Sequence, residues 1–193
     1  TGQYQTAAVS GGQIYISSDY GNTWTAKESS RNWSQVAMSA TGQYQTVALT
    51  DGGFIYVSSD YGNTWVAKSG ASGMSGTADK VSMSATGQYQ SAILRGGGIY
   101  ISSNYGLNWN VADSSRQWKN IAISSNGQYQ IACIGGDNTT GYIYVSSDFG
   151  NNWSEKESIR NWSSVSISST GQYQVAVVGN PGYTVKGFIY ISS

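Results

Sequence analysis

The sequence predicts an all-β fold built from repeats, and three observations support this prediction. The tetrapeptide Gly-Gln-Tyr-Gln recurs with its glycine at positions 2, 42, 87, 127 and 171, so successive copies lie 40, 45, 40 and 44 residues apart. The segment Ser-Ser-Asp-Tyr-Gly-Asn-Thr-Trp occurs identically at 17–24 and 58–65. Short runs that alternate apolar and polar residues separate these motifs, which is typical of strands covered on one face.

A period near forty residues with four short strands per unit predicts a β-propeller. We label the strands of each repeat A to D outward from the propeller axis. Strand B follows a Thr-Gly or Asn-Gly turn, as at 44–49, strand C is an Ile-Tyr-Ile type segment such as 14–16, and strand D begins near the last Trp of the motif. Strand A is expected at 35–39, 80–84, 120–124 and 164–168.

Counting these strands gives five B and five C strands but only four A and four D strands. We therefore expect a single domain, 1–193, of five blades, with repeats beginning near 1, 41, 86, 126 and 170. The first blade then lacks its innermost strand and the last blade lacks its outermost strand. Unpaired strand edges favour pairing with another chain; alternatively, the missing strands belong to sequence outside these residues.

Longer insertions fall at 69–77, 135–141 and 179–187, the last of which holds the sole proline, Pro181. All three are expected to be loops on one face of the propeller, where ligands of such rings usually bind. The A–B turns and the Ser-x-Asp-x-Gly motifs would lie on the opposite, more uniform face.

The repeated Ser-x-Asp-x-Gly-x-Thr-Trp motif resembles the Asp box of sialidase-type repeats, also called BNR repeats. Its glycines supply the positive φ of a tight hairpin turn, and its aspartates can accept backbone N–H groups there. The third copy has Asn104 for the acid and Asn108 for Thr, and the fourth has Asn152 for Thr. The box residues are Ser17, Asp19, Gly21, Thr23, Trp24; Ser58, Asp60, Gly62, Thr64, Trp65; Ser102, Asn104, Gly106, Trp109; and Ser146, Asp148, Gly150, Trp153.

This resemblance implies a structural hairpin in the outer part of each blade and says little about activity. Sialidases use three converging arginines, a tyrosine nucleophile paired with a glutamate, and a separate acid, all from non-equivalent places. Here Arg31, Arg116 and Arg160 occupy one equivalent position, and Glu28 and Glu157 are copies of each other. We therefore expect no catalytic residues and treat a sialidase-like hydrolase as the least favoured alternative.

The composition excludes several other classes of function. Ten basic and ten acidic residues give a net charge of zero, so the basic surplus of a nucleic-acid-binding protein is missing. The chain has no histidine, the commonest metal ligand, and we expect no metal or other cofactor. Its single cysteine, Cys133, lies in an apolar run and is expected to be an inert buried thiol. The Ser/Thr/Asn/Gly- and aromatic-rich composition favours an extracellular location, with no signal peptide or membrane span visible in the sequence.

One equivalent element offers a binding hypothesis: an arginine that precedes a tryptophan by two residues at the start of strand A. Aromatic rings with neighbouring Arg and Asn donors can hold sugars, but each ring could instead wedge between blades with its arginine stacked on it. The third repeat has Ala78 in place of the tryptophan. The candidate glycan-binding residues are Arg31, Trp33, Arg116, Trp118, Arg160 and Trp162, and the candidate N-glycosylation sites are Asn32, Asn138, Asn152 and Asn161.

We therefore expect a non-catalytic extracellular scaffold that joins copies of itself, in oligomers or fibres, or flanking repeats through its incomplete blades. A glycan-binding propeller is the alternative.

Overall fold

The computed structural model describes residues 2–52, 54–68, 77–114, 116–136, 139–179 and 189–192, with Thr77 described by its backbone alone. The expected insertions at 69–77 and 179–187, Pro181 and the sequon at Asn138 therefore lie at least in part outside the described residues. Every regular element within these ranges is a β-strand, which confirms the all-β prediction. No helix in the described ranges is suited to crossing a membrane.

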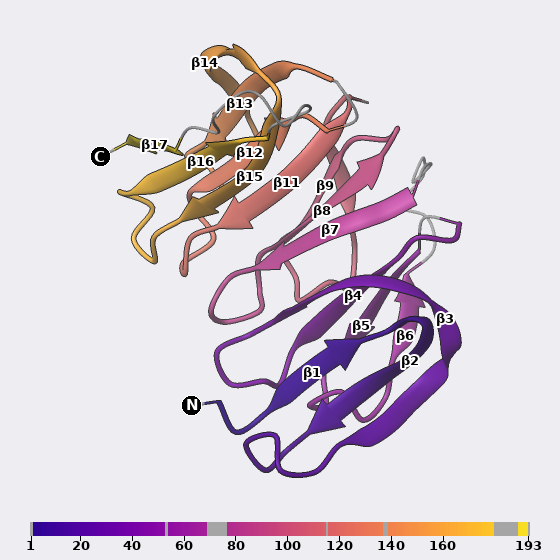
Figure 1. Cartoon of the computed structure of the whole chain (residues 1–193). Coiled ribbons are helices and arrows are strands. Elements are labelled where there is room, and N and C mark those ends of the chain that lie inside the picture. The colour runs from indigo at the N-terminus through magenta and orange to yellow at the C-terminus, as the bar shows by residue number, and fades with distance from the viewer. Residues whose placement is uncertain are drawn as a thin grey trace.

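The described strands form five consecutive antiparallel blades of a propeller, of which the first two are joined into one six-stranded sheet (Figure 1). The long strand β3 (Thr25–Met38) belongs to two blades, because its first half pairs with β2 (Ser10–Ser17) and its second half pairs with β4 (Gln45–Leu49). Blade 1 comprises β1 (Gln5–Ala8), β2 (Ser10–Ser17) and the first half of β3 (Thr25–Met38). Blade 2 comprises the second half of β3, β4 (Gln45–Leu49), β5 (Ile55–Ser58) and β6 (Val66–Lys68). Blade 3 comprises β7 (Thr77–Met83), β8 (Gln90–Arg95), β9 (Ile99–Ser102) and β10 (Asn110–Asp113). Blade 4 comprises β11 (Trp118–Ile123), β12 (Gln130–Ile134), β13 (Gly141–Ser146) and β14 (Ser154–Arg160). Blade 5 comprises β15 (Trp162–Ile167), β16 (Gln174–Val178) and β17 (Ile189–Ser192).

The strand inventory confirms the expected incomplete ends among the described residues. Blade 1 has strands B, C and D, and blade 5 has strands A, B and C. The A strands of blades 2 to 5 contact one another in succession, as innermost strands around an axis do. These A strands begin earlier than expected, at or just before the tryptophan position, and a register shift follows that position in each pairing with strand B.

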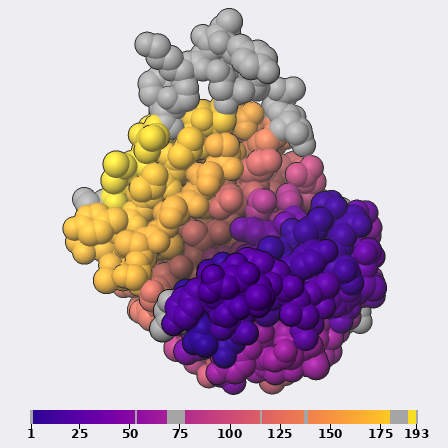
Figure 2. All heavy atoms as spheres, turned by 60° about the horizontal axis from the view of Figure 1, so that its bottom comes forward, coloured from indigo at the N-terminus to yellow at the C-terminus, as the bar shows by residue number. Residues whose placement is uncertain are grey.

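The hydrophobic core consists of layers between successive blades rather than of one central cluster. Each of the four apolar clusters takes residues from two neighbouring blades, from blades 1 and 2 through blades 4 and 5. Among the described strands, no comparably extensive contact joins blade 5 to blade 1. In Figure 2 the indigo first blade and the yellow last blade lie on separate sides of the molecule, with the middle blades visible between them. The described residues thus form an open arc of blades.

A glycine–tyrosine contact recurs at the turn between strands A and B. Gly87 has a φ of +82°, and a Cβ added there would lie 2.7 Å from the Cβ of Tyr44 in the preceding blade. Gly42, Gly127 and Gly171 meet the preceding tyrosine in the same way. Two separate causes therefore require glycine at this turn: the positive φ of the backbone and the close tyrosine side chain of the preceding blade.

Buried glutamines link the same blades by hydrogen bonds. The Thr46 hydroxyl donates to Gln90 Oε1 at 2.6 Å, and the Ser91 hydroxyl donates to Gln130 Oε1 at 2.7 Å. Because each amide nitrogen also donates to a backbone carbonyl in its own turn, these glutamines are satisfied although buried.

Candidate functional site

The Asp boxes are hydrogen-bonded turns in which the carboxylate is already used. In the first box, Asp19 Oδ1 accepts the Thr23 backbone N–H at 2.9 Å, and Asp19 Oδ2 accepts the Thr23 hydroxyl at 2.6 Å. The Ser17 hydroxyl donates to Asp19 Oδ1 at 2.8 Å and accepts the Gly21 N–H at 2.9 Å. The Trp24 indole N–H donates to the Gly21 carbonyl at 3.1 Å. These bonds, the Thr23 hydroxyl first, lower the pKa of Asp19 to about 2.

The other boxes have the same turn, but they differ in the hydrogen bonds that the residue at the acidic position accepts. Burial raises the pKa of Asp60, but hydrogen bonds from Thr64 and Ser58 outweigh it and hold the pKa below its ordinary value. In the fourth box the Asn152 amide replaces the threonine hydroxyl and donates to Asp148 Oδ2 at 2.6 Å, again lowering the carboxyl pKa. In the third box Asn104 keeps the Asn108 backbone bond at 3.0 Å through its one oxygen.

The turn is tighter than the glycines alone require. The residue before each box glycine also has a positive φ, between 62° and 64°, at Tyr20, Tyr61, Tyr105 and Phe149. Two successive positive φ values are those of a type I′ hairpin turn, which needs no ligand to form. The boxes therefore hold strands C and D together and leave no free acid for chemistry.

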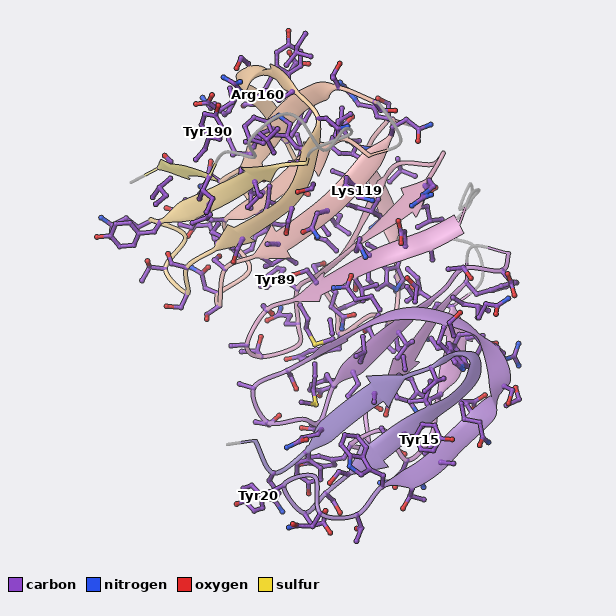
Figure 3. All side chains as sticks on the ribbon, viewed as in Figure 1. Tyr15, Tyr20, Tyr89, Lys119, Arg160 and Tyr190 are labelled. Carbon is purple, nitrogen blue, oxygen red and sulfur yellow. The ribbon has the colours of Figure 1, made fainter. Side chains whose placement is uncertain are left out.

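The Arg–Trp elements are packed rather than open. Trp33, Trp118 and Trp162 are 1%, 2% and 0% exposed, so no ring face is available to stack on a sugar. Each of the preceding arginines lies over a strand C tyrosine, at 5.2 Å from the Tyr56 centroid for Arg31, which is also 6.0 Å from the Trp33 centroid. The corresponding distances are 4.7 Å for Arg116 over Tyr144 and 4.8 Å for Arg160 over Tyr190, the latter pair labelled in Figure 3. This placement favours the packing alternative, with Ala78 buried where the third blade lacks the ring.

One cluster in blade 4 was missed by sequence reasoning. The Tyr144 hydroxyl donates to Glu155 Oε1 at 2.8 Å and accepts a hydrogen bond from Arg116, which also pairs with Asp113 at 3.5 Å. The signal was the position of Glu155 directly opposite Tyr144 in the C–D register, where blade 2 has Ala67. Burial, then the bond to Glu155, raises the pKa of Tyr144 to about 12. The cluster thus joins strands C and D of blade 4 to Arg116, which precedes strand A of the same blade.

The described sequon asparagines have hydrogen-bond partners of their own. The Asn32 amide donates to Asp51 at 2.6 Å, the Asn152 amide donates to Asp148, and Asn161 Oδ1 accepts the Gly136 N–H at 2.8 Å. Asn161 is half-buried, whereas Asn32 and Asn152 are exposed. Glycosylation of these residues stays a prediction.

The terminal blades expose side chains whose counterparts in the other blades are buried or half-buried. On strand C, the residues that face the next blade are buried in blade 2, with Ile55 at 0% and Val57 at 7% exposure. Their counterparts in blade 5, Ile189 and Ile191, are 69% and 75% exposed. Tyr173, the counterpart of the packed Tyr44, is 52% exposed. We call Tyr173, Val175, Val177, Ile189 and Ile191 the C-terminal face.

The opposite face of blade 1 carries the receiving half of the same contact. Trp24 is 43% exposed, whereas its counterpart Trp65 is 9% exposed against blade 1. Tyr20 is 65% exposed and projects from the turn after β2 (Figure 3). No atom lies within 4 Å of a Cβ added at Gly2, where the equivalent glycines meet a tyrosine. We call Gly2, Tyr15, Tyr20, Gly21 and Trp24 the N-terminal face.

A groove of about 330 Å³ runs beside β17, on the side where no described strand pairs with it. Blade 4 contributes Ile143, Val145, Lys156 and Glu157 to it, and blade 5 contributes Tyr190 and Ser192. The groove is therefore partly apolar and is bounded by an unpaired strand edge. Among the described residues, no cluster of acidic or cysteine side chains suited to a metal ion is present.

Comparison with known proteins identifies the repeat and the fold. A family model described as BNR-Asp box repeat matches residues 55–68 and 143–156, and no curated protein sequence matches significantly. The chain is an Asp-box repeat β-propeller.

Several solved propellers share the fold at low sequence identity. A GH74 enzyme from Niastella koreensis superposes with a TM-score of 0.72 at 15% identity, over 99% of this chain and 34% of that one. A YCF48 structure bound to a D1 peptide gives 0.66 at 13% identity, over 92% of this chain and 58% of that one. A nidogen/laminin complex gives 0.67 at 10% identity, over 91% of this chain and 70% of that one. The chain thus spans about a third of this GH74 chain and less than two thirds of this YCF48 chain. These neighbours include an enzyme as well as proteins described only by what they bind.

Proposed function

We propose that this chain is a non-catalytic extracellular scaffold whose incomplete terminal blades bind further Asp-box repeats, in copies of itself or in flanking chain. The observation that carries the proposal is the contrast between Ile189 and Ile191, which are exposed, and their equivalents in blades 1 to 4, which are buried or half-buried against a following blade. Exposed apolar surface that is buried wherever its partner is present marks an interaction surface.

The two terminal faces supply complementary halves of one interface. Within the chain, Tyr4 packs on Tyr61 with ring centroids 4.4 Å apart, and Tyr44 packs on Tyr105 at the same distance. By the same rule, Tyr173 would pack on Tyr20 and against Gly2 of a second copy. Ile191 would meet Gly21, as Ile16 meets Gly62. Such a head-to-tail contact is heterologous and produces rings or filaments rather than a two-fold dimer.

The proposed absence of catalysis is supported by the state of the acids. Among the described residues, Asp19, Asp60 and Asp148 of the boxes have carboxyl pKa values below the ordinary value, because each carboxylate accepts hydrogen bonds within its turn. An acid catalyst in glycoside hydrolysis needs an upward shift and a partner carboxylate across the substrate. The GH74 likeness at 15% identity supports the fold only.

Glycan binding is the alternative proposal, with the guanidinium groups of Arg31, Arg116 and Arg160 as the binding groups. No observation favours it over association, since the three tryptophan rings that would stack on sugars are buried. Binding on a glycan array that is lost in the Arg31→Ala and Arg160→Ala variants would support this alternative.

The test of the scaffold proposal is the mass of the purified chain in solution as its concentration is raised, measured by light scattering with electron microscopy of the same sample. We expect assemblies larger than one chain. The Ile189→Asp/Ile191→Asp double variant should dissociate them, because a buried unpaired carboxylate opposes association. Both residues are exposed, so the variant chain should fold.

The matched control is Val111→Asp, which also replaces an exposed aliphatic residue by aspartate. Val111 belongs to β10, is 54% exposed and lies on neither terminal face. Its assemblies should persist. A chain that stays strictly monomeric at every concentration, or assemblies that survive the double variant, would overturn the proposal.

A further inference from the structure

The groove beside β17 is lined by the counterparts of residues that surround a buried tryptophan in blade 2. We call this part of the groove the apolar seat. In blade 2, Trp65 packs in one cluster with Ile14 and Ile16 of blade 1 and with Val47 and Tyr56 of its own blade. In the repeat register these four correspond to Ile143, Val145, Ala176 and Tyr190, all of which line the groove. Trp109 occupies the same place in blade 3, packed with Val57 and Tyr100.

The strand edge beside this seat is also set up for pairing. In blade 2, Ile55, Tyr56 and Val57 of strand C pair with Lys68, Ala67 and Val66 of strand D. The equivalent residues of β17 pair with β16 on one side, and no described strand lies on the other. An open edge of this kind can accept an added strand through main-chain hydrogen bonds.

Ser192 adds a specific recognition element. Its counterpart Ser58 is 4% exposed, donates to Asp60 Oδ1 at 2.8 Å and accepts the Gly62 N–H at 2.9 Å. Ser192 is exposed at the end of β17, beside the groove. A strand that brought its own aspartate and glycine would complete an Asp box with this hydroxyl.

We infer that the groove beside β17 is an acceptor site for a segment of sequence type Asp-x-Gly-x-Thr-Trp from another chain, in which Asp-x-Gly-x forms the box turn beside Ser192 and the tryptophan inserts between blades 4 and 5. The inference rests on the proposed function and names the ligand of one terminal blade. The tryptophan ring provides the affinity by filling the apolar seat, and the box hydrogen bonds to Ser192 set the register.

The probe is a fluorescein-labelled peptide with the sequence of residues 60–68, added to the full chain at a concentration where it is monomeric. We expect saturable binding by fluorescence anisotropy. Replacing the peptide's tryptophan by alanine should weaken binding by about tenfold or more, as truncation of a buried aromatic anchor does. A peptide of the same composition in scrambled order is the control.

Two changes in the protein test the location of the site. Val145→Asp places a charge in the apolar seat, and Ser192→Ala removes the box hydroxyl at an exposed position where folding is not at stake. Both should weaken peptide binding, while Val66→Asp, at an exposed position of blade 2, should not. If Val145→Asp fails to fold, Ser192→Ala and the alanine peptide still decide the question.

A second readout is the reaction of Cys133 with a thiol reagent. Cys133 is fully buried in the cluster between blades 4 and 5, so it reacts only when these blades separate. A strand seated between them should slow the reaction.

Equal binding of the wild-type and alanine peptides, or no binding at all, would overturn the inference. Assembly without peptide binding would leave the scaffold proposal standing through face-to-face packing alone. Peptide binding by a chain that never assembles would keep the acceptor site and remove self-assembly.

Discussion

At the residue scale, the contacts within a turn and with the neighbouring blade explain why a position carries aspartate or glycine. The acidic position of the box is Asp in blades 1, 2 and 4 and Asn in blade 3. The aspartates have a second carboxylate oxygen, which accepts a hydrogen bond from a Thr or Asn side chain at 2.6 to 2.7 Å. Asn104 provides a natural comparison, because its turn keeps the backbone bond to Asn108.

The first prediction concerns acid stability. Because the pKa of Asp60 is lowered by folding, its stabilisation is present above the unfolded pKa, near 3.8, and is lost as the pH falls toward the folded value. Asp60→Asn should lower the free energy of unfolding by about 1 kcal/mol at neutral pH, the typical contribution of one hydrogen bond. It should also reduce the loss of stability as the pH falls below about 4, measured by urea denaturation at several pH values. An unchanged pH profile would contradict this role.

The second prediction separates backbone strain from steric contact. Gly87→Ala and Gly96→Ala both place a Cβ at positive φ, +82° and +74°. The Cβ added at Gly87 meets the Tyr44 side chain, whereas no heavy atom lies within 4 Å of the Cβ added at Gly96. Both should be destabilised by strain, and Gly87→Ala should lose about 1–3 kcal/mol more through overpacking. Denaturant midpoints of the two variants give the comparison. Equal losses would mean that the tyrosine simply moves aside.

At the scale of the element, strand D of blade 2 is attached to its blade mainly through one tryptophan and a short ladder. Strand β6 pairs through Val66, Ala67 and Lys68, of which the first two are exposed. The Trp65 ring, by contrast, is inserted between two blades and donates its N–H to the Gly62 carbonyl at 2.9 Å. The box and its tryptophan therefore fix the outer strand, and the strand in turn covers the blade.

The third prediction follows from the different exposure of two identical box tryptophans. Trp65→Ala should cost about 3–5 kcal/mol, the usual loss for a buried aromatic residue. Trp24→Ala should cost clearly less, since Trp24 lies on the N-terminal face and is 43% exposed. Thermal and urea unfolding of the two variants test this. A Trp24 variant as unstable as the Trp65 variant would show that blade 1 has another covering layer in solution.

At the scale of the whole molecule, stability is a sum of interfaces between neighbouring blades, and the ends of the arc have one interface each. Blade 5 is held to blade 4 by Trp162, Val165 and Ala176 and lacks an outer strand among the described residues. In such an array the terminal unit is expected to open more readily than the internal ones.

The fourth prediction uses Cys133 to measure this opening. Burial raises the pKa of its thiol to about 12, so the folded chain should hardly react with a thiol reagent at neutral pH. Reaction should follow separation of blade 5 and be faster than global unfolding measured by tryptophan fluorescence. Ala176→Gly, which thins the interface, should accelerate the reaction. A rate equal to that of global unfolding would show that all blades open together.

Much of the fold could be predicted from sequence because it is written in local repeats. The positive φ of Gly21 and the acceptor role of Asp19 follow from a short turn whose atoms lie within a few residues of one another. Strand existence follows from alternation, whereas the early start of strand A does not, because the register shift after Trp33 depends on packing between blades. The Tyr144–Glu155 pair was missed for a similar reason, since it joins two strands through their register.

The sequence by itself determined the repeat, the turns, the order of strands and the unequal number of inner and outer strands, because these depend on contacts within about forty residues along the chain. Only the tertiary structure decided which face of each strand is covered. It placed Trp33, Trp118 and Trp162 inside the interfaces instead of on a binding rim, and it left Ile189 and Ile191 uncovered at the end of the arc. Burial of identical residues differs because burial is a property of the neighbouring blade, which is present for internal repeats and absent from the described residues at the ends.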